Sequence, residues 1–238
     1  MTSATTSGSI TFGSTTSGST TSGSTTSGPA AATSSPTSDG YHHGDLPNAL
    51  RRAAVEVIEE RGAGGFSLRE VARRAGVSHT APAHHFGDMK GLLTSVAEEG
   101  FAALHAACTV AVDGVDDPVD QLTALGRAYV SLARTNRGHC EVMFRTDIID
   151  TDDPQLVTCG LEAYGLLEAT VRRLIEAEDL RVGVDEATWL CWSTMQGLVQ
   201  LQPKIELIGQ MKDVPVPAVD QLIARFTEMM VDGIRNAP

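Results

Sequence analysis

The segment from Ser67 to Leu93, which reads SLREVARRAGVSHTAPAHHFGDMKGLL, constrains the fold of this 238-residue chain more than any other. Ser67 is followed three residues later by Glu70, the spacing of a capping box, in which two side chains accept hydrogen bonds from each other's backbone N–H groups. Helical spacing also places four apolar residues on one face of the segment, namely Leu68, Val71, Ala72 and Ala75. This pattern predicts a short amphipathic helix that begins at Ser67.

A second short helix is expected after a tight turn. Gly76 follows the last periodic residue, where helices commonly end in a left-handed conformation that glycine adopts without steric cost. Ser78 is a favourable N-cap for the next helix, and Phe86 would close that helix on its buried side. Two short helices joined by a glycine turn form a helix-turn-helix, a motif whose second helix enters the DNA major groove.

The sequence from residue 41 to residue 93 resembles the DNA-binding domain of the tetracycline-repressor (TetR) family. The resemblance rests on YHHGDL at its start, the helix-turn-helix, and the ending HHFGDMKGLL. The same start and ending resemble those of a subgroup whose ligand domain carries a Trp-x-x-x-His-Gly signature. That signature reads Trp192-Ser-Thr-Met-Gln196-Gly197 here, with Gln in place of His. The resemblance implies a DNA-binding domain at residues 41–87 and a helical ligand-binding and dimerisation domain at residues 88–238.

Charge and composition divide the chain in a similar way. Between residues 41 and 95, seven Arg and Lys residues face six Asp and Glu residues, whereas the remainder from residue 96 has 11 basic and 23 acidic residues. This asymmetry suits a protein that places one end on DNA. Residues 1–40 are rich in Ser, Thr and Gly, so we expect a disordered tail, and they lack the apolar segment of a signal peptide. No apolar run approaches the ~20 residues that span a bilayer, so a soluble, cytoplasmic protein is expected.

Helical periodicity continues to the end of the chain. Acidic N-caps mark four of the predicted helix starts, at Asp45, Asp88, Asp117 and Asp153, the last two followed by Pro. A helix from Ala187 to about Leu207 is apolar on nearly all sides, which indicates burial. A last helix is expected after Pro215 and Pro217. The pattern predicts an all-α fold of about nine helices with no convincing strand.

The residues expected to touch DNA follow from the motif. The first part of the second helix meets base edges, and the candidates there are Ser78, His79, Thr80 and His84. Residues beside that helix would contact phosphates, and the candidates are Ser67, Arg69 and Lys90. The alternative for each is a solvated surface residue, and His84, near Phe86, could belong to the core.

Two residues depart from the family's pattern. The family usually has an aromatic residue, most often Tyr, at the position of Ala83 in this DNA-facing set, and the Tyr hydroxyl commonly binds phosphate. It also commonly has Lys at the position of Met89, although Lys90 is adjacent. A lost phosphate contact lowers affinity without directly changing sequence preference. Pro82 removes one backbone donor within the second helix.

The resemblance also implies a ligand pocket among the middle helices and a homodimer formed mainly by the last two long helices. Apolar, aromatic and adaptable residues supply the pocket candidates, which are Tyr129, Met143, Phe144, Tyr164, Trp189, Trp192, Met195 and Gln196. Such residues at helical spacing are also typical of plain core, so both interpretations stay open. The apolar stripe from Leu222 to Ile234 would pair with its symmetry mate.

No catalytic motif stands out, because G-x-S-x-G, P-loop and H-E-x-x-H patterns are missing, so neither an enzyme nor a cofactor is expected. The acidic cluster from Asp147 to Asp153 lacks the spacing of a calcium loop, and the four scattered cysteines lack that of a zinc site. The predicted function is a ligand-responsive transcriptional regulator, expected to be a repressor, that binds a palindromic operator as a homodimer and is released by a small molecule. The alternative is a helical ligand-binding or protein-interaction module whose degenerate head no longer binds DNA specifically.

Overall fold

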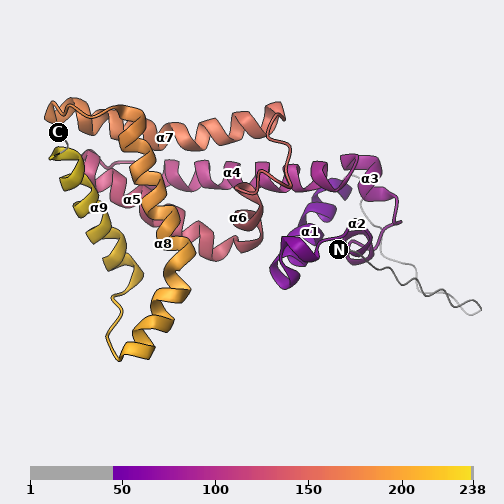
Figure 1. Ribbon diagram of the computed structural model, residues 1–238. Helices are drawn as coiled ribbons and strands as arrows, with labels where there is room; N and C mark the ends of the chain where they lie inside the picture. Colours follow the sequence, from indigo (N-terminus) through magenta and orange to yellow (C-terminus); the bar gives the residue numbers. More distant parts are fainter. Residues whose placement is uncertain (1–44, 237–238) are drawn as a thin grey trace, which may run out of the picture. The chain divides into compact units, whose positions relative to one another are not determined.

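The computed structural model describes residues 45–236, so the predictions for residues 1–40 and for the start of YHHGDL lie outside the described residues. Within this range the chain forms nine α-helices, one short 3₁₀ helix and no strand (Figure 1), which confirms the all-α prediction. The elements are α1 (Leu46–Arg61), η1 (Ala63–Gly65), α2 (Leu68–Arg74), α3 (Ala81–Phe86), α4 (Met89–Val112), α5 (Pro118–Thr135), α6 (Arg137–Met143), α7 (Pro154–Glu178), α8 (Val184–Lys212) and α9 (Val219–Arg235).

Acidic side chains cap three of the long helices where the sequence predicts them. The Asp88 carboxylate accepts a hydrogen bond from the backbone N–H of Gly91 at 2.9 Å and begins α4. Asp117 and Asp153 accept from the backbone N–H groups two and three residues later and begin α5 and α7. Each cap satisfies donors that the first turn of a helix leaves without a partner.

The first half of the helix-turn-helix is confirmed in all but one contact. The Ser67 hydroxyl accepts from the Glu70 N–H at 3.3 Å and begins α2. Gly76 has a φ of 68°, the left-handed conformation expected at this turn. The return contact of the predicted capping box is not formed, because the Glu70 carboxylate binds Arg73 and Arg74 instead.

The second helix of the motif begins later than predicted, so the assignment of Ser78 as its N-cap is wrong. Helix α3 starts at Ala81, Thr80 occupies the N-cap position, and the hydroxyls of Ser78 and Thr80 bond to each other at 3.1 Å. Pro82 explains the shift, because proline fits the first turn of a helix but disrupts its interior. With α3 starting at Ala81, Pro82 lies in the first turn, where its missing N–H costs nothing.

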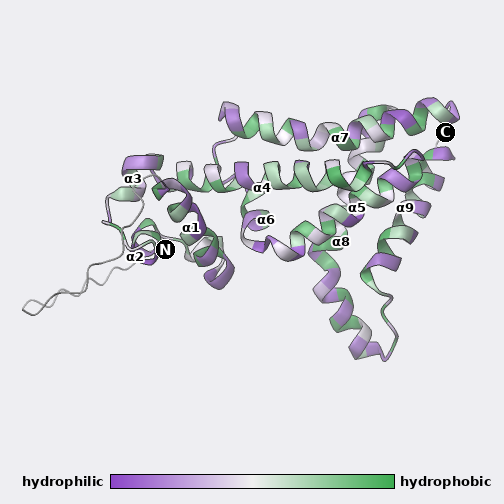
Figure 2. Ribbon diagram, turned by 180° about the vertical axis from the view of Figure 1, so that it is seen from behind, coloured by the Kyte–Doolittle hydropathy of each residue, from purple (hydrophilic) through white to green (hydrophobic). Residues whose placement is uncertain are grey.

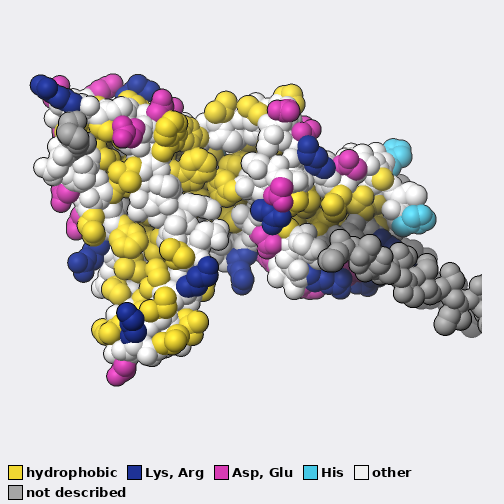
Figure 3. Space-filling model, viewed as in Figure 1, with side chains coloured by type: hydrophobic (Ala, Val, Ile, Leu, Met, Phe, Trp, Pro, Cys, Tyr) yellow, Lys and Arg dark blue, Asp and Glu magenta, His cyan; other side chains and the backbone are white. Residues whose placement is uncertain are grey.

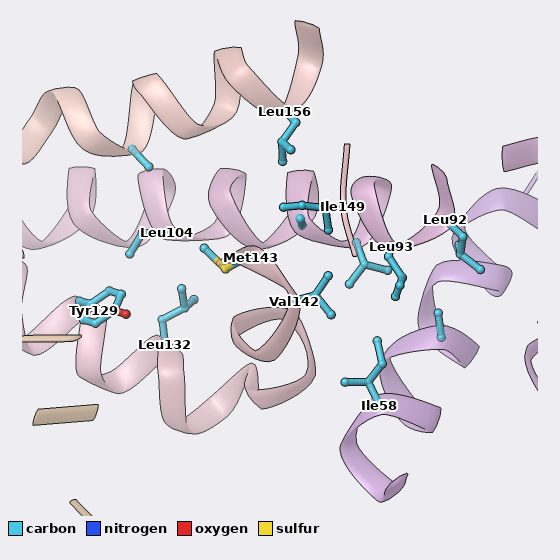
Figure 4. Close-up of a cluster of buried hydrophobic side chains, with 14 of the residues drawn as sticks. Ile58, Leu92, Leu93, Leu104, Tyr129, Leu132, Val142, Met143, Ile149 and Leu156 are labelled. Carbon is cyan, nitrogen blue, oxygen red and sulfur yellow. The ribbon is translucent and has the colours of Figure 1, made fainter. Parts of the chain in front are cut away.

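Helix α4 is the central element of the fold and packs against α1, α5, α6 and α7. Most of α4 is coloured as hydrophobic in Figure 2, as expected for a helix covered on several sides. Figure 4 shows Val142 and Met143 pointing from α6 toward α4, near Leu93 and Leu104. These side chains belong to one buried cluster that also includes Ile58 of α1, so α4 and α6 connect the first helices to the rest of the fold.

Helix α8 is longer and more exposed than predicted. It runs from Val184 to Lys212, through Pro203, and buries only some of its apolar residues. Trp189 is 60% exposed and Leu201 is 48% exposed. The expectation that this helix is buried on nearly all sides is therefore wrong for the single chain.

Candidate DNA-binding surface and ligand cavity

All eight residues predicted to contact DNA lie on α2, the turn, α3 or the first turn of α4, and all are exposed. They are Ser67, Arg69, Ser78, His79, Thr80, Ala83, His84 and Lys90. Histidine side chains are visible over α3 in Figure 3. The folding of this segment therefore brings the predicted residues onto accessible surface, as base and phosphate contacts require, while the contacts themselves stay a prediction.

Ion pairs engage most of the arginines near this surface. The Glu70 carboxylate binds Arg73 at 2.8 Å, Arg74 at 3.2 Å and Arg61 at 3.3 Å. Hydrogen bonds from Arg73 and Arg74 lower the pKa of Glu70 from its ordinary 4.5 to about 2, so its charge persists at any physiological pH. Arg74 also binds Glu60 of α1. Sequence patterns did not indicate this network, which leaves less positive charge for phosphates than the composition suggests.

Two of the predicted phosphate residues differ in their surroundings. Arg69 takes part in none of the ion pairs found among residues 45–236, and its side chain is exposed. Lys90, in contrast, places its Nζ atom 3.0 Å from Asp150 Oδ1, in the segment between α6 and α7. The backbone N–H of Asp150 also donates to the Thr94 hydroxyl at 2.8 Å, which holds that segment against α4. Lys90 therefore interacts with an acidic group before any DNA is bound.

An apolar cavity of about 320 Å³ lies among α4, α5, α7 and α8. Five of the predicted ligand residues line it, namely Tyr129, Phe144, Tyr164, Trp192 and Met195. Aromatic rings are in contact along its wall, with centroid distances of 5.6 Å from Phe101 to Phe144, 5.7 Å from Phe144 to Trp192 and 6.1 Å from Tyr164 to Trp192. The size and lining are typical of sites that hold a small organic molecule.

The other three predicted ligand residues lie outside the cavity lining. Met143 is 2% exposed and packs against α4, where a Cβ atom on Gly100 would lie 2.5 Å from its sulfur. Trp189 is directed to solvent. Gln196 is half-buried and accepts a hydrogen bond from the hydroxyl of Tyr129, which does line the cavity.

Sequence reasoning missed the contribution of α4 and the start of α5. Phe101, Leu104 and Cys108 line the cavity from α4, and Leu122 and Leu125 line it from α5. Their helical spacing marks a buried face, which was a usable signal for burial. It did not show that this face borders a void rather than packed side chains.

Helix α6 lies between the cavity and the first helices. Phe144, at its C-terminal end, lines the cavity. The Glu141 carboxylate accepts from the backbone N–H of Ala63 at 2.6 Å, and the Gly138 N–H donates to Glu59 of α1 at 3.3 Å. A Cβ atom on Gly138 would lie 3.0 Å from the backbone oxygen of Val55. The backbones of α6 and α1 are therefore in close contact, so a shift of α6 toward α1 would displace α1.

A second apolar surface follows α8 and α9. On α8, alternating steps of four and three residues bring a mostly apolar set of residues to one side, Leu190, Thr194, Gly197, Leu201, Lys204, Ile208 and Met211. Leu190 and Thr194 also border a groove against α9 that includes Phe226 and Met229. Hydrophobic side chains gather over these two helices in Figure 3. Exposed apolar side chains on neighbouring helices are common at interaction sites.

The described part of the chain bears on metal binding, cysteine chemistry and membrane crossing. Residues 45–236 hold no group of three or more His, Cys, Asp or Glu side chains placed to bind a metal ion. The four cysteines are free thiols, three of them buried. None of the helices in this range is long and apolar enough to cross a membrane.

An exposed helix-turn-helix joined through α4 and α6 to an apolar cavity defines a class of protein, the helix-turn-helix regulators with a helical ligand-binding body. Two family models agree with this assignment. The one described as "Bacterial regulatory proteins, tetR family" matches residues 50–96, and the one described as "Tetracyclin repressor-like, C-terminal domain" matches residues 122–230. The chain belongs to the TetR family of transcriptional regulators, a non-enzymatic family. The Trp-x-x-x-His-Gly subgroup stays a prediction.

Individual relatives agree with the family. The chain is 36% identical over 77 residues to the HTH-type transcriptional regulator BetI of Stenotrophomonas maltophilia, over 32% of this chain and 39% of that protein. The chain thus matches about two-fifths or less of the length of such curated relatives. Among solved structures, a protein of unknown function from a Rhodococcus species is 31% identical with a TM-score of 0.67, over 82% of this chain and 98% of that one. The TetR family regulator PfmR from Thermus thermophilus is 19% identical with a TM-score of 0.61, over 80% and 97%, and supports the fold alone.

Proposed function

We propose that this protein is a ligand-responsive transcriptional regulator that binds a palindromic DNA operator as a homodimer and is released by a small molecule. Residues 41–87 would form the DNA-binding domain and residues 88–238 the ligand-binding and dimerisation domain. The observation that carries the proposal is the exposed surface of α3 on the same unit as an apolar cavity, with α4 and α6 between them. Its operator lies in the cytoplasm, where the protein would act as a repressor.

The proposed release mechanism uses α6 as the moving element. A ligand in the cavity contacts Phe144 and displaces the end of α6, and the close contact of Gly138 with α1 passes the shift to the DNA-binding domain. Release then depends on the ligand binding better to the shifted arrangement, because a ligand moves an equilibrium only by its differential affinity.

The proposed homodimer uses the apolar surface of α8 and α9. A twofold interface brings the same surface together from both copies, and the residue spacing on α8 suits helix-against-helix packing. Two α3 helices would then lie about one DNA turn apart, roughly 34 Å, to match the two halves of an operator.

A mobility-shift assay with the DNA upstream of the protein's own gene tests this proposal, at low and moderate salt. We expect specific, salt-sensitive retention that Thr80→Ala weakens, because Thr80 is exposed beside α3. Thr158→Ala, on the exposed surface of α7, is the matched control and should bind like the wild type. Equal binding to unrelated DNA, or equal binding by Thr80→Ala and wild type, contradicts the proposed recognition surface.

The second candidate function is a helical ligand-binding or protein-interaction module without specific DNA binding. The ion pairs of Arg61, Arg73 and Arg74 with acidic residues favour it, as does Ala83 in place of the family's aromatic residue. In that case the assay gives no specific retention at any salt concentration, while the cavity still binds its ligand.

A further inference from the structure

The ligand cavity is lined without any ionised side chain. None of the residues that border it, all within the described part of the chain, is Asp, Glu, Lys, Arg or His. Burial also keeps the two lining thiols protonated, because it raises the pKa of Cys108 to about 11 and that of Cys191 to about 12. A charged ligand group would therefore lose its hydration in this cavity without gaining a counter-charge, which is strongly unfavourable.

Tyr129 lines the cavity, and its hydroxyl is bonded to Gln196, a residue outside the lining. The Tyr129 hydroxyl donates to the Gln196 side-chain oxygen, and burial raises the pKa of Tyr129, so the hydroxyl keeps its proton at neutral pH. Since that proton is engaged, the hydroxyl oxygen remains as an acceptor. A ligand that reaches this oxygen would satisfy it best with an O–H or N–H donor.

The size and wall of the cavity limit the rest of the ligand. The volume of about 320 Å³ lies at the lower end of the roughly 300–1,000 Å³ found for ligand pockets, so it favours a compact ligand. The contacts among Phe101, Phe144, Trp192 and Tyr164 offer ring faces and edges against which a flat aromatic body packs well.

We propose that the effector of this regulator is an uncharged, compact aromatic or similarly apolar molecule with a single hydrogen-bond donor that binds the Tyr129 hydroxyl. This inference rests on the proposed function, because a cavity ligand is an effector only of a ligand-responsive regulator. Ligands that carry a carboxylate, a phosphate or an ammonium group inside the cavity are excluded.

Four probes with the same bicyclic body test the charge requirement on the full-length wild-type protein. They are 2-naphthol, naphthalene, 2-naphthoate and 2-naphthylmethylammonium, and their affinities are measured by isothermal titration calorimetry at pH 7. We expect 2-naphthol and naphthalene to bind at least about ten-fold more tightly than either charged probe. Equal or tighter binding of a charged probe overturns the proposal, and so does the absence of binding by 2-naphthol.

A Tyr129→Phe variant tests the hydrogen bond. We expect its affinity for 2-naphthol to fall about three- to ten-fold and its affinity for naphthalene to stay within about two-fold of wild type. The ratio of the two affinities separates a lost hydrogen bond from a general change of cavity shape, which would alter both. An unchanged ratio overturns the role of Tyr129.

A mobility-shift assay with the same probes separates this inference from the proposed function. Operator release by 2-naphthol and not by 2-naphthoate supports both. If 2-naphthol binds without affecting DNA retention, the requirement for an uncharged ligand stands and the release mechanism fails. If 2-naphthoate binds and releases DNA, the proposed regulator function stands and the requirement for an uncharged ligand fails.

Discussion

The contact between α6 and α1 can be tested by adding one methyl group. In Gly138→Ala, the new Cβ atom would meet Val55 Cγ1 at 2.9 Å, Glu59 Cγ at 3.0 Å and the Val55 backbone oxygen at 3.0 Å. The backbone oxygen belongs to α1 and cannot turn away as a side chain could. We therefore expect α6 and α1 to be forced apart.

The magnitude follows from a matched control. Gly165→Ala places its Cβ in open space on α7 and should gain about 0.5–1 kcal/mol from better helix propensity. Gly138→Ala also lies in a helix, so the difference between the two variants isolates the steric cost, about 1–3 kcal/mol. For a chain of this size, that difference corresponds to a Tm lower by roughly 2–12 °C.

Scanning calorimetry measures the Tm, and a mobility shift measures operator affinity. We expect Gly138→Ala to weaken operator binding, because separating α6 from α1 changes the position of the DNA-binding domain. Equal Tm values for the two alanine variants would refute the close contact. A lower Tm with unchanged operator affinity would instead refute α6 as the route from the cavity to the DNA-binding domain.

Three further predictions concern charge and assembly. Asp150→Asn frees Lys90 from a half-exposed ion pair, so operator affinity should rise by at most about five-fold. The slope of log affinity against log salt concentration should become steeper by about 0.9 per half-site, and a mobility shift over a salt series measures it. The pKa of Glu70 is about 2 in the folded protein and ordinarily 4.5. The ionised Glu70 carboxylate therefore stabilises the folded protein fully above about pH 4.5, and this stabilisation is lost as the pH falls toward 2. Glu70→Gln should flatten the fall of Tm over that range. Leu201→Glu places like charges together in the proposed dimer and should give monomers in sedimentation equilibrium, whereas Leu161→Glu, on the exposed surface of α7, should not.

Local rules predicted the starts of α4, α5 and α7 and the turn after α2, because the causes of these features lie within a few residues. The caps at Asp88, Asp117 and Asp153 and the turn at Gly76 need no information from the rest of the fold. The start of α3 was misplaced because a good N-cap residue, Ser78, was weighed without the stronger constraint of Pro82. Proline is favoured in the first turn of a helix, and Pro82 lies there because α3 starts at Ala81.

The site was predictable only in part, because a helical period identifies a buried face without showing what that face meets. Met143 and Phe144 are adjacent in the sequence and were both proposed for the cavity. Met143 ends α6 and packs on α4, whereas Phe144 is the C-cap, where the chain leaves helical geometry and directs the ring to the cavity. The ion pair between Lys90 and Asp150 joins residues 60 positions apart, a relation that no local pattern contains.

The disagreement over α8 carries information about assembly. The apolar composition of this helix indicated burial, yet Leu190, Leu201 and Ile208 are 42%, 48% and 50% exposed in the single chain. A chain that exposed such a surface permanently would be prone to association, because apolar side chains are stabilised by leaving water. Their spacing on one side of the helix suits contact with another helix, and α9 covers only one edge of that side. The proposed homodimer reconciles the two observations, since a second copy would cover the surface that one chain leaves open.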